Sequence, residues 1–211
     1  MSRLLLLGLL ILPIAAGTSA AAMGKGTSVL AIQLTEGDGD FVTYEGGLGE
    51  ISHRRHSDMG VQGQYFYMWN DDYTVTVGAG IGFARETDNP GVNGLVGQPS
   101  VREFFRSWQF RVGSDRVGKL NDRFHVHAGP GFQVWGGNSE LQRGTTVLKS
   151  ATSLRLALDG RIGVMLNWGE SFGMAGQVGH YWGYASAKDA GAEAKFTPSG
   201  ANAAMGVFFS F

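Results

Sequence analysis

The 211-residue sequence has no cysteine and, after its first twenty or so residues, no apolar run long enough to cross a bilayer as a helix. The lack of cysteine excludes a disulfide scaffold, a cysteine-ligated metal site and a cysteine nucleophile. Lys and Arg number 17 against 18 Asp and Glu, a formal net charge of −1 that gives no electrostatic case for nucleic acid. If the mature chain lies in a membrane, it must form a closed barrel, because only helices and barrels satisfy every backbone group in lipid.

The amino-terminus has the three parts of a secretory signal peptide. Arg3 is followed by an apolar core from Leu4 to Ala16 and then by small residues from Thr18 to Ala22. The core is shorter than the roughly 20 apolar residues that a membrane helix needs, which argues against an uncleaved anchor. We therefore predict a signal peptide over residues 1–22, cleaved after Ala20 or Ala22, and a single domain over residues 23–211.

The last eleven residues, 201–211, alternate strictly between two faces. Apolar residues at every second position end on Phe209 and Phe211, and the residues between them are mostly small or polar. A period of two is typical of a strand whose two faces have different surroundings. The carboxy-terminus is thus predicted to be a strand with one apolar face.

The same alternation recurs along the chain and predicts eight strands, over residues 28–34, 59–69, 73–84, 108–120, 124–134, 153–168, 172–184 and 201–211. Three-residue turns are expected at 70–72, 121–123 and 169–171, and long loops at 35–58, 85–106, 136–151 and 185–200. The pattern is interrupted around Ser114–Arg116, where we expect a bulge. One helical turn is possible at 189–195. Alternating short turns and long loops are typical of an all-β, eight-stranded antiparallel up-and-down transmembrane β-barrel.

Aromatic residues on the apolar face support a membrane barrel. A girdle is predicted beside the short turns from Trp69, Tyr73, Phe124, Trp168 and Phe172. Phe83 lies ten residues beyond Tyr73 on the same face, a rise of about 26 Å along a tilted strand, close to the apolar band of about 25 Å in such barrels. A soluble lipocalin-like barrel would have the apolar face inside and the charged residues outside. Here we expect the reverse, with the apolar face outside and the charged residues on the inward face.

The inward face is predicted to hold a polar cluster, because eight strands leave room only for their own side chains. Its members are Arg111, His125, His127, Arg155, Asp159 and Arg161. A packed polar core is favoured over a proton or ion path, since buried charges are usually paired. His125 and His127 have a spacing that could chelate a metal, but no third ligand is identifiable, so we predict no metal and no cofactor.

A second candidate site is a cationic patch in the first expected loop, formed by His53, Arg54, Arg55 and His56. Such a patch could bind lipopolysaccharide phosphates or an acidic partner. The alternative is an ordinary solvated loop segment.

The terminal pattern and the strand count resemble the small OmpA/OmpX-type outer-membrane barrels of Gram-negative bacteria. In that family a terminal aromatic strand is read by the barrel-assembly machinery, which implies that Phe209 and Phe211 form an assembly signal. The resemblance also implies an integral outer-membrane location, contact with outer-membrane lipid and lipopolysaccharide, and a monomer. It covers nearly all of the mature chain.

We expect a non-enzymatic barrel whose loops serve envelope integrity, adhesion or lipopolysaccharide contact. A narrow channel or a transporter of small apolar ligands is the alternative. A third possibility is a lipid A deacylase, which has a His-x-Ser pair where this chain reads Tyr184-Ala185-Ser186. Glu193 is available downstream, but His180 is six residues from Ser186, about 20 Å along a strand and beyond the reach of a base.

Overall fold

The computed structural model describes the backbone of residues 23–45, 50–87, 101–143, 146–189 and 192–211, and the predicted signal peptide lies outside these residues. The described part consists of strands joined by turns, and no helix in it could span a membrane. The strands are β1 (Ser28–Glu45), β2 (Glu50–Met68), β3 (Tyr73–Thr87), β4 (Val101–Lys119), β5 (Phe124–Arg143), β6 (Thr146–Asn167), β7 (Phe172–Asp189), β8 (Ala192–Phe196) and β9 (Ser199–Ser210).

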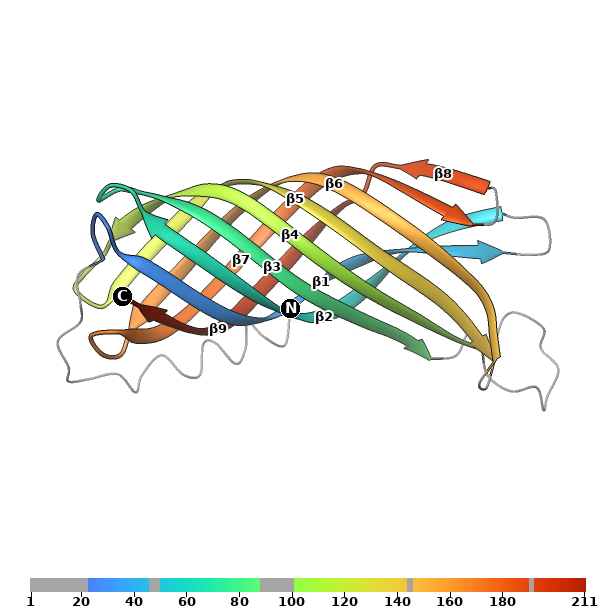
Figure 1. Ribbon diagram of the computed structural model, residues 1–211, viewed down its shortest axis with the longest axis horizontal. Coiled ribbons are helices and arrows are strands. Elements are labelled where there is room, and N and C mark those ends of the chain that lie inside the picture. The colour runs from blue at the N-terminus through green and yellow to red at the C-terminus, as the bar shows by residue number, and fades with distance from the viewer. Residues whose placement is uncertain (1–22, 46–49, 88–100, 144–145, 190–191) are drawn as a thin grey trace.

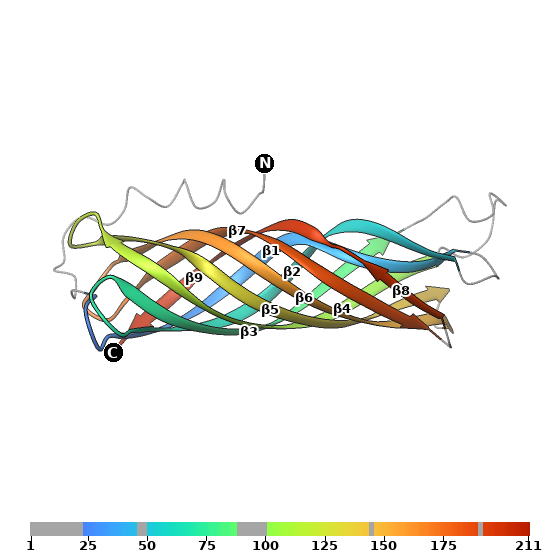
Figure 2. The same ribbon diagram turned by 90° about the horizontal axis from the view of Figure 1, so that it is seen from above.

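The strands close into one antiparallel barrel (Figures 1 and 2). Consecutive strands from β1 to β8 pair with one another, and β9 pairs with both β1 and β7. Both β8 and β9 pair with β7, and they continue a single register, from Ala185↔Phe196 to Trp182↔Ser199. The break between them falls at Pro198, which has no N–H for the ladder and whose carbonyl accepts from the Gly183 N–H at 2.9 Å. The wall therefore has eight strand positions, and the predicted eight-stranded fold is confirmed.

The barrel has a turn end and a hairpin end. At the turn end, Asn70 and Asn121 each accept two backbone N–H bonds, from the residues two and three positions further on, which fixes the β2–β3 and β4–β5 turns. The two termini of the barrel meet at the same end, where the Ser28 N–H donates to the Phe211 carbonyl at 2.9 Å. The β6–β7 turn is also at this end, where the Trp168 N–H donates to the Phe172 carbonyl at 3.0 Å. At the opposite end, the hairpin end, β1 is joined to β2, β3 to β4, and β5 to β6.

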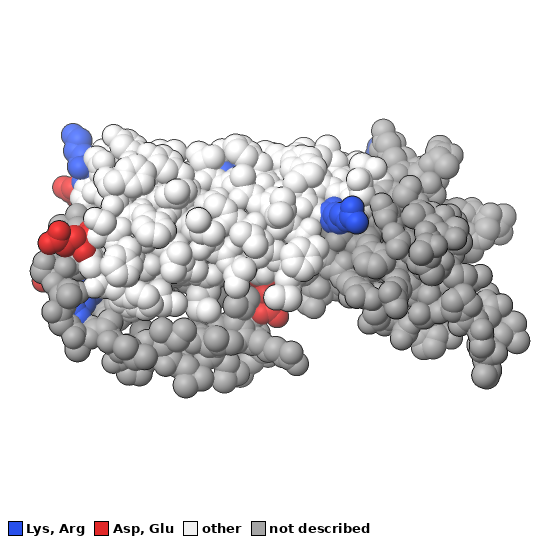
Figure 3. All heavy atoms as spheres, turned by 60° about the horizontal axis from the view of Figure 1, so that its bottom comes forward, with Lys and Arg blue, Asp and Glu red and all other residues white. Residues whose placement is uncertain are grey.

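Alternate side chains of each strand point into the barrel and out of it. On β3, Thr74 and Thr76 are only 2% and 1% exposed, whereas Val75 and Val77 are 48% and 39% exposed. The outward side chains form an apolar belt in which described charged residues are sparse and lie mostly towards its two edges (Figure 3). A soluble protein would hide such a belt, because large contiguous apolar surfaces are rare in water.

Three of the four predicted long loops were wrong in most of their length. The expected loop at 35–58 consists largely of the continued β1–β2 ladder, which is paired from Ser28↔Tyr67 to Glu45↔Glu50. The expected loops at 136–151 and 185–200 are likewise largely strand, and in the expected loop at 85–106 residues 85–87 and 101–106 are strand while residues 88–100 lie outside the described residues. Alternation disappears there because these segments lie beyond the apolar belt, where water can surround both faces. The helical turn expected at 189–195 was also wrong, since Asp189 ends β7 and residues 192–195 belong to β8.

The bulge expected at Ser114–Arg116 is absent. The pairing of β4 with β3 runs without a shift through Val75↔Ser114 and Thr74↔Asp115. Pairing with β5 lapses only at these two residues and resumes in the same register at Arg116↔Ala128. Pro130 stands opposite the gap and lacks the N–H that a ladder needs. Among the described pairings, the register shifts between Leu141 and Gln142, where β5 pairs with β6.

The sequence predicted a polar barrel interior, and this was wrong for part of the lumen. Near the turn end it holds an apolar group of side chains, the turn-end cluster: Val29, Ala31, Phe66, Met165, Ala175 and Phe208. Met23 packs against this cluster. Phe66 and Phe208 are at most 1% exposed, so the cluster fills the lumen at this end.

Candidate functional site

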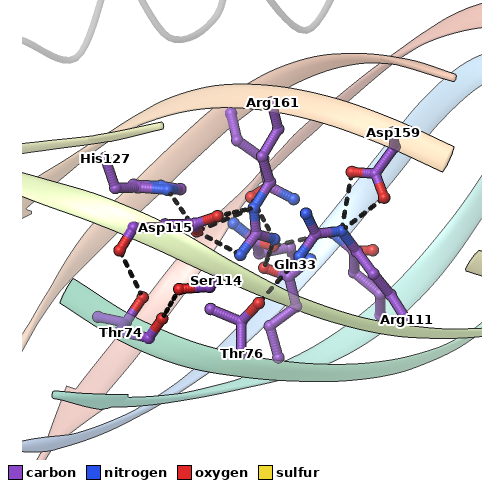
Figure 4. A network of polar contacts seen from close by, with 12 residues as sticks. Gln33, Thr74, Thr76, Arg111, Ser114, Asp115, His127, Asp159 and Arg161 are labelled. Atoms are coloured by element: carbon purple, nitrogen blue, oxygen red, sulfur yellow. Dashed lines mark hydrogen bonds and ion pairs between the residues drawn. The ribbon is translucent and has the colours of Figure 1, made fainter. Parts of the chain in front are cut away.

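The centre of the barrel is held by a buried ion-pair network (Figure 4). Arg161 of β6 donates from Nε to both carboxylate oxygens of Asp115 on β4, at 3.2 and 3.0 Å, and its Nη2 pairs with the same carboxylate. His127 of β5 contacts Asp115 Oδ2 through Nδ1 at 3.0 Å. Asp115 is fully buried, so its charge is stabilised by these two partners rather than by water.

A second ion pair lies beside the first. Arg111 donates from Nε to the Asp159 carboxylate oxygens at 3.1 and 2.9 Å, and its Nη1 donates to Thr76 Oγ1 at 2.9 Å. Gly131 leaves the space for this pair, since a Cβ there would lie 2.6 Å from Asp159 Oδ1 and against the Arg111 guanidinium. The inward glycine thus allows two charged groups to meet within a narrow barrel.

Glutamines bind a further donor of Arg161 and extend the network. Gln64 and Gln177 accept from Arg161 Nη1 at 2.8 and 3.2 Å. Gln62 donates to Gln33 at 2.9 Å and accepts from Gln109 at 3.2 Å, which extends the polar layer towards the hairpin end. The central charges are therefore surrounded by neutral polar groups.

A stack of aromatic rings holds the third interior arginine. The guanidinium carbon of Arg155 lies 3.5 Å from the centroid of the Trp135 ring and 4.3 Å from that of Tyr181. Both contacts are within the range of cation–π attraction. This stack occupies the lumen on the hairpin side of the ion pairs.

His125 lies apart from the other predicted interior residues. It is 1% exposed, and neither ring nitrogen has a hydrogen-bond partner within the described part of the chain. The structure does not join His125 and His127 in a metal set: no group of three potential His, Asp or Glu ligands occurs among the described residues. His127 is held by Asp115 instead.

Little open space remains in the interior. One interior cavity has a volume of about 40 Å³ and is lined by interior polar and aromatic residues, including Arg111, Arg161, Gln62, Gln109 and Trp135. A buried water requires roughly 10–15 Å³ measured in this way, so the cavity could hold about three waters. Together with the turn-end cluster, this filling leaves no wide aqueous path through the described interior.

Several interior residues were missed from the sequence, among them Asp115, Trp135 and Gln33. Asp115 was assigned to the expected bulge, because the inward Val117 broke the polar pattern of that face. Trp135 stood next to the expected loop at 136–151. Gln33 was on the inward face of the first strand but was not recognised as part of the cluster. A strict count of alternate positions would have placed Asp115 and Gln33 inside.

The predicted girdle residues lie on the outer surface at the turn end. The rings of Trp69 and Tyr73 have centroids 6.3 Å apart, as do those of Trp168 and Phe172, and Phe124 begins β5 at the same end. The Phe211 side chain is 75% exposed and Phe209 50%. Aromatic rings at one edge of an apolar belt are typical of a membrane interface.

The predicted cationic patch does not lie in a loop. His53, Arg54, Arg55 and His56 are on β2, where their backbones pair with residues 39–42 of β1. Their side chains lie outside the described residues.

Two outward arginines mark the edges of the apolar belt on β4. Arg106 and Arg116 are both exposed, and the positions between them on this face are Trp108, Phe110, Val112 and Ser114. Ten residues of a strand tilted by about 40° rise on the order of 26 Å, which matches an apolar band of about 25 Å. The distance between these arginines therefore equals the thickness of a membrane core.

The geometry around Ser186 does not form a nucleophile and base. Ser186 pairs with Leu154 on one side and Lys195 on the other. The His180 ring packs on Trp182, with centroids 4.5 Å apart, six residues from Ser186. Tyr184 lies between them on the same outward face.

A closed antiparallel wall of eight strand positions, an apolar belt and a filled lumen define the class of small outer-membrane β-barrels, and solved structures of that class match this fold. OprG from Pseudomonas aeruginosa matches with a TM-score of 0.57 and 12% identity, covering 91% of this chain and 99% of that one. Ail, the attachment invasion locus protein of Yersinia pestis, in complex with sucrose octasulfate, matches with a TM-score of 0.51 and 13% identity (89% and 99% covered). AlkL in lipid bilayers has a TM-score of 0.51 and 13% identity (91% and 93% covered). No family model and no curated protein matches the sequence.

Proposed function

We propose that this chain is a non-enzymatic, non-conducting protein of the outer membrane that acts through the hairpins at its extracellular end, in adhesion, envelope integrity or lipopolysaccharide contact. Residues 1–22 would direct export, and the turn end would face the periplasm. The observation that carries the proposal is the filled lumen: an apolar cluster, a buried ion-pair network and a cavity of only about 40 Å³.

The length of the strands supports a role for the hairpin end. Glu36↔Met59 is the last pair of β1 and β2 whose two side chains are both described. From this pair the ladder continues for nine more residues on each strand, to Glu45↔Glu50. Nine strand residues extend about 30 Å. A barrel that only spanned the membrane would need strands of about 9–11 residues. An attachment protein is among the structures with this fold, so a barrel of this size is compatible with attachment.

The direct test is single-channel recording in planar bilayers, with a general porin as positive control. The expected result is no stable conductance from the folded protein at voltages where the porin conducts. A reproducible unitary conductance would contradict the non-conducting part of the proposal and favour the narrow-channel alternative.

The role of the hairpins is tested by replacing residues 38–57 with an Asn-Gly turn that joins β1 to β2. Cells carrying the shortened barrel are expected to lose adhesion to epithelial cells or to become sensitive to detergent, while the heat-modifiable band of the folded barrel on gels is unchanged. Wild-type adhesion and resistance in the shortened variant would contradict the proposal.

A further inference from the structure

Methionine side chains collect at the turn end of the lumen. Met68 ends β2 and is 1% exposed, and Met165 lies two residues before the end of β6 and is 3% exposed. Met23 packs against the turn-end cluster, of which Met165 is a member. The Gly26 N–H donates to the Met68 carbonyl at 2.7 Å, so the segment that carries Met23 is fixed beside the end of β2. Three thioether groups therefore lie at one end of a narrow barrel.

His125 lies in the same layer of the lumen. It is the second residue of β5, its register partner on β6 is Met165, and it is 1% exposed. Side chains that stand directly opposite each other on one face of two paired strands are close neighbours. Neither ring nitrogen of His125 has a hydrogen-bond partner in the part of the chain that the structure describes. Buried polar groups in folded proteins are nearly always partnered, so this imidazole indicates a bound ion or another ligand.

The lumen is narrow enough for these groups to share one ligand. In the strand order, β2 is three positions from β5 and four from β6 around an eight-position wall, so inward side chains of these strands point at one another across the lumen. An eight-stranded barrel has an interior just wide enough for its own side chains. Phe66 and Phe208 are at most 1% exposed and make the layer apolar. Met23 is half-buried, so it connects the buried groups with the outside at the turn end.

We propose that Met68, Met165 and His125 form a binding site for monovalent copper, with Met23 as a further ligand at its entrance. Soft thioether ligands select Cu(I), whereas Ca²⁺ and Mg²⁺ require oxygen ligands. No group of three His, Asp or Glu ligands, the kind of set that holds Zn²⁺, occurs among the described residues. The expectation of no metal rested on the spacing of the two histidines and did not consider methionine. The site goes beyond the proposed function, which concerns the hairpin end.

The first test measures the Cu(I) affinity of the full mature barrel, refolded in detergent without oxygen, by competition with a coloured Cu(I) chelator. The expected result is one Cu(I) per barrel. Loss of an outer-shell group alone typically weakens metal binding about 10–100-fold. Each of H125F, M68L and M165L removes a direct ligand, so each is expected to weaken Cu(I) binding by about a hundredfold or more. Zn²⁺ is expected not to compete.

Two matched controls carry the same side chains on the outer surface. Met59 is 56% exposed on β2, and His180 is exposed on β7. M59L and H180F are therefore expected to bind Cu(I) as the wild type does. Heat-modifiable migration confirms the folding of each variant, and leucine or phenylalanine keeps the layer filled with apolar side chains of similar size.

X-ray absorption at the copper edge identifies the ligands in the wild type. The expected spectrum has at least two sulfur neighbours and one nitrogen neighbour. This measurement uses the wild type alone, so it decides the question even if a variant does not fold. The proposal is overturned if the wild type binds no Cu(I), if the neighbours are only oxygen and nitrogen, or if Zn²⁺ competes equally. Wild-type affinity in H125F, M68L and M165L, or equal weakening in M59L or H180F, would also overturn it.

Discussion

Asp115 is the residue on which the central charge balance depends. It is the only carboxylate that the described side chains place between Arg161 and His127, and it is fully buried. Removing one partner of a buried pair leaves an uncompensated charge, which costs more than the pair itself contributes. The interior network therefore fills the lumen with polar groups whose buried carboxylates are paired with cationic side chains.

Replacement of Asp115 by Asn is expected to lower the free energy of unfolding by about 3–5 kcal/mol, because Arg161 would keep only its glutamine partners. Urea unfolding of the barrel in lipid vesicles, followed by tryptophan fluorescence, measures this change. Asp122→Asn is the control. The hydrogen bond from Lys119 and the charge of Lys119 lower the pKa of Asp122, yet this carboxylate is fully exposed in a turn. Its removal should therefore leave the free energy of unfolding unchanged. Equal stability of the Asp115 variant and the wild type would contradict the account.

Gly131 and Gly160 offer a matched pair of substitutions on the paired strands β5 and β6. Gly131→Ala is expected to destabilise the barrel by about 1–3 kcal/mol, because the new methyl would collide with the Arg111–Asp159 pair. Gly160→Ala should be neutral, since a Cβ there meets nothing within 4 Å. The same urea titration measures both. The explanation fails if the two alanines behave alike.

Individual residues were predictable only where the two faces of a strand differ in polarity. Arg111, Asp159 and Arg161 were placed inside because apolar residues flank them on both sides. Asp115 was not predicted to lie inside, because the next inward residue is the apolar Val117. The sequence pattern there indicated a change of register. The apolar turn-end cluster was missed for a related reason: Phe66 and Phe208 are apolar on the face expected to be polar, and the sequence does not indicate at which height the lumen changes character.

At the scale of strands, two prolines interrupt the ladder without shifting its register. Pro130 interrupts the β4–β5 pairing but keeps its register with Gly160 of β6. Ser114 and Thr74 compensate, since the Ser114 hydroxyl donates to the Thr74 carbonyl and the Thr74 hydroxyl to the Asp115 carbonyl. Pro198 divides β8 from β9, and the register with β7 is the same on both sides of it. The two interruptions change the ladder locally and leave the closure of the barrel intact.

The terminal strand allows packing and assembly to be separated. The Phe211 backbone is held by Ser28, whereas its side chain is largely exposed. We therefore expect Phe211→Ala to refold in vesicles with nearly wild-type stability but to reach the outer membrane of cells in much lower amount. Leu120→Ala, at another exposed apolar residue of the turn end, is the control for both measurements. Normal membrane levels of the Phe211 variant would refute the predicted assembly signal.

Strand positions were predictable within the membrane and not beyond it. The alternation of β3 or β6 follows from lipid on one side and a packed lumen on the other. Beyond the belt, water can surround both faces, so a continued strand such as residues 35–45 carries the composition of a loop. The extension of the hairpins is therefore information that the structure adds.

At the scale of the whole molecule, the wall is closed where it crosses the apolar belt. The β1–β9 ladder continues from Val29↔Ser210 to Gly37↔Asn202, which closes the barrel where unpaired backbone groups would be most costly. Beyond Gly37, the described part of β1 pairs only with β2. The β1–β2 hairpin therefore stands apart beyond the belt, whereas the β3–β4 and β5–β6 hairpins stay joined through the β4–β5 ladder as far as Val101↔Arg143.

The most direct measurement of the central claim, that the outward face is dissolved in lipid, is depth-dependent fluorescence quenching. The chain has no native cysteine, so single cysteines at Phe110 and Leu156 on the belt and at Asp72 in a turn can each carry a bimane label. The account predicts that brominated acyl chains quench the first two labels and that aqueous iodide quenches only the third. Iodide quenching of all three labels, with no effect of brominated lipid, would contradict a membrane barrel and favour a water-soluble one.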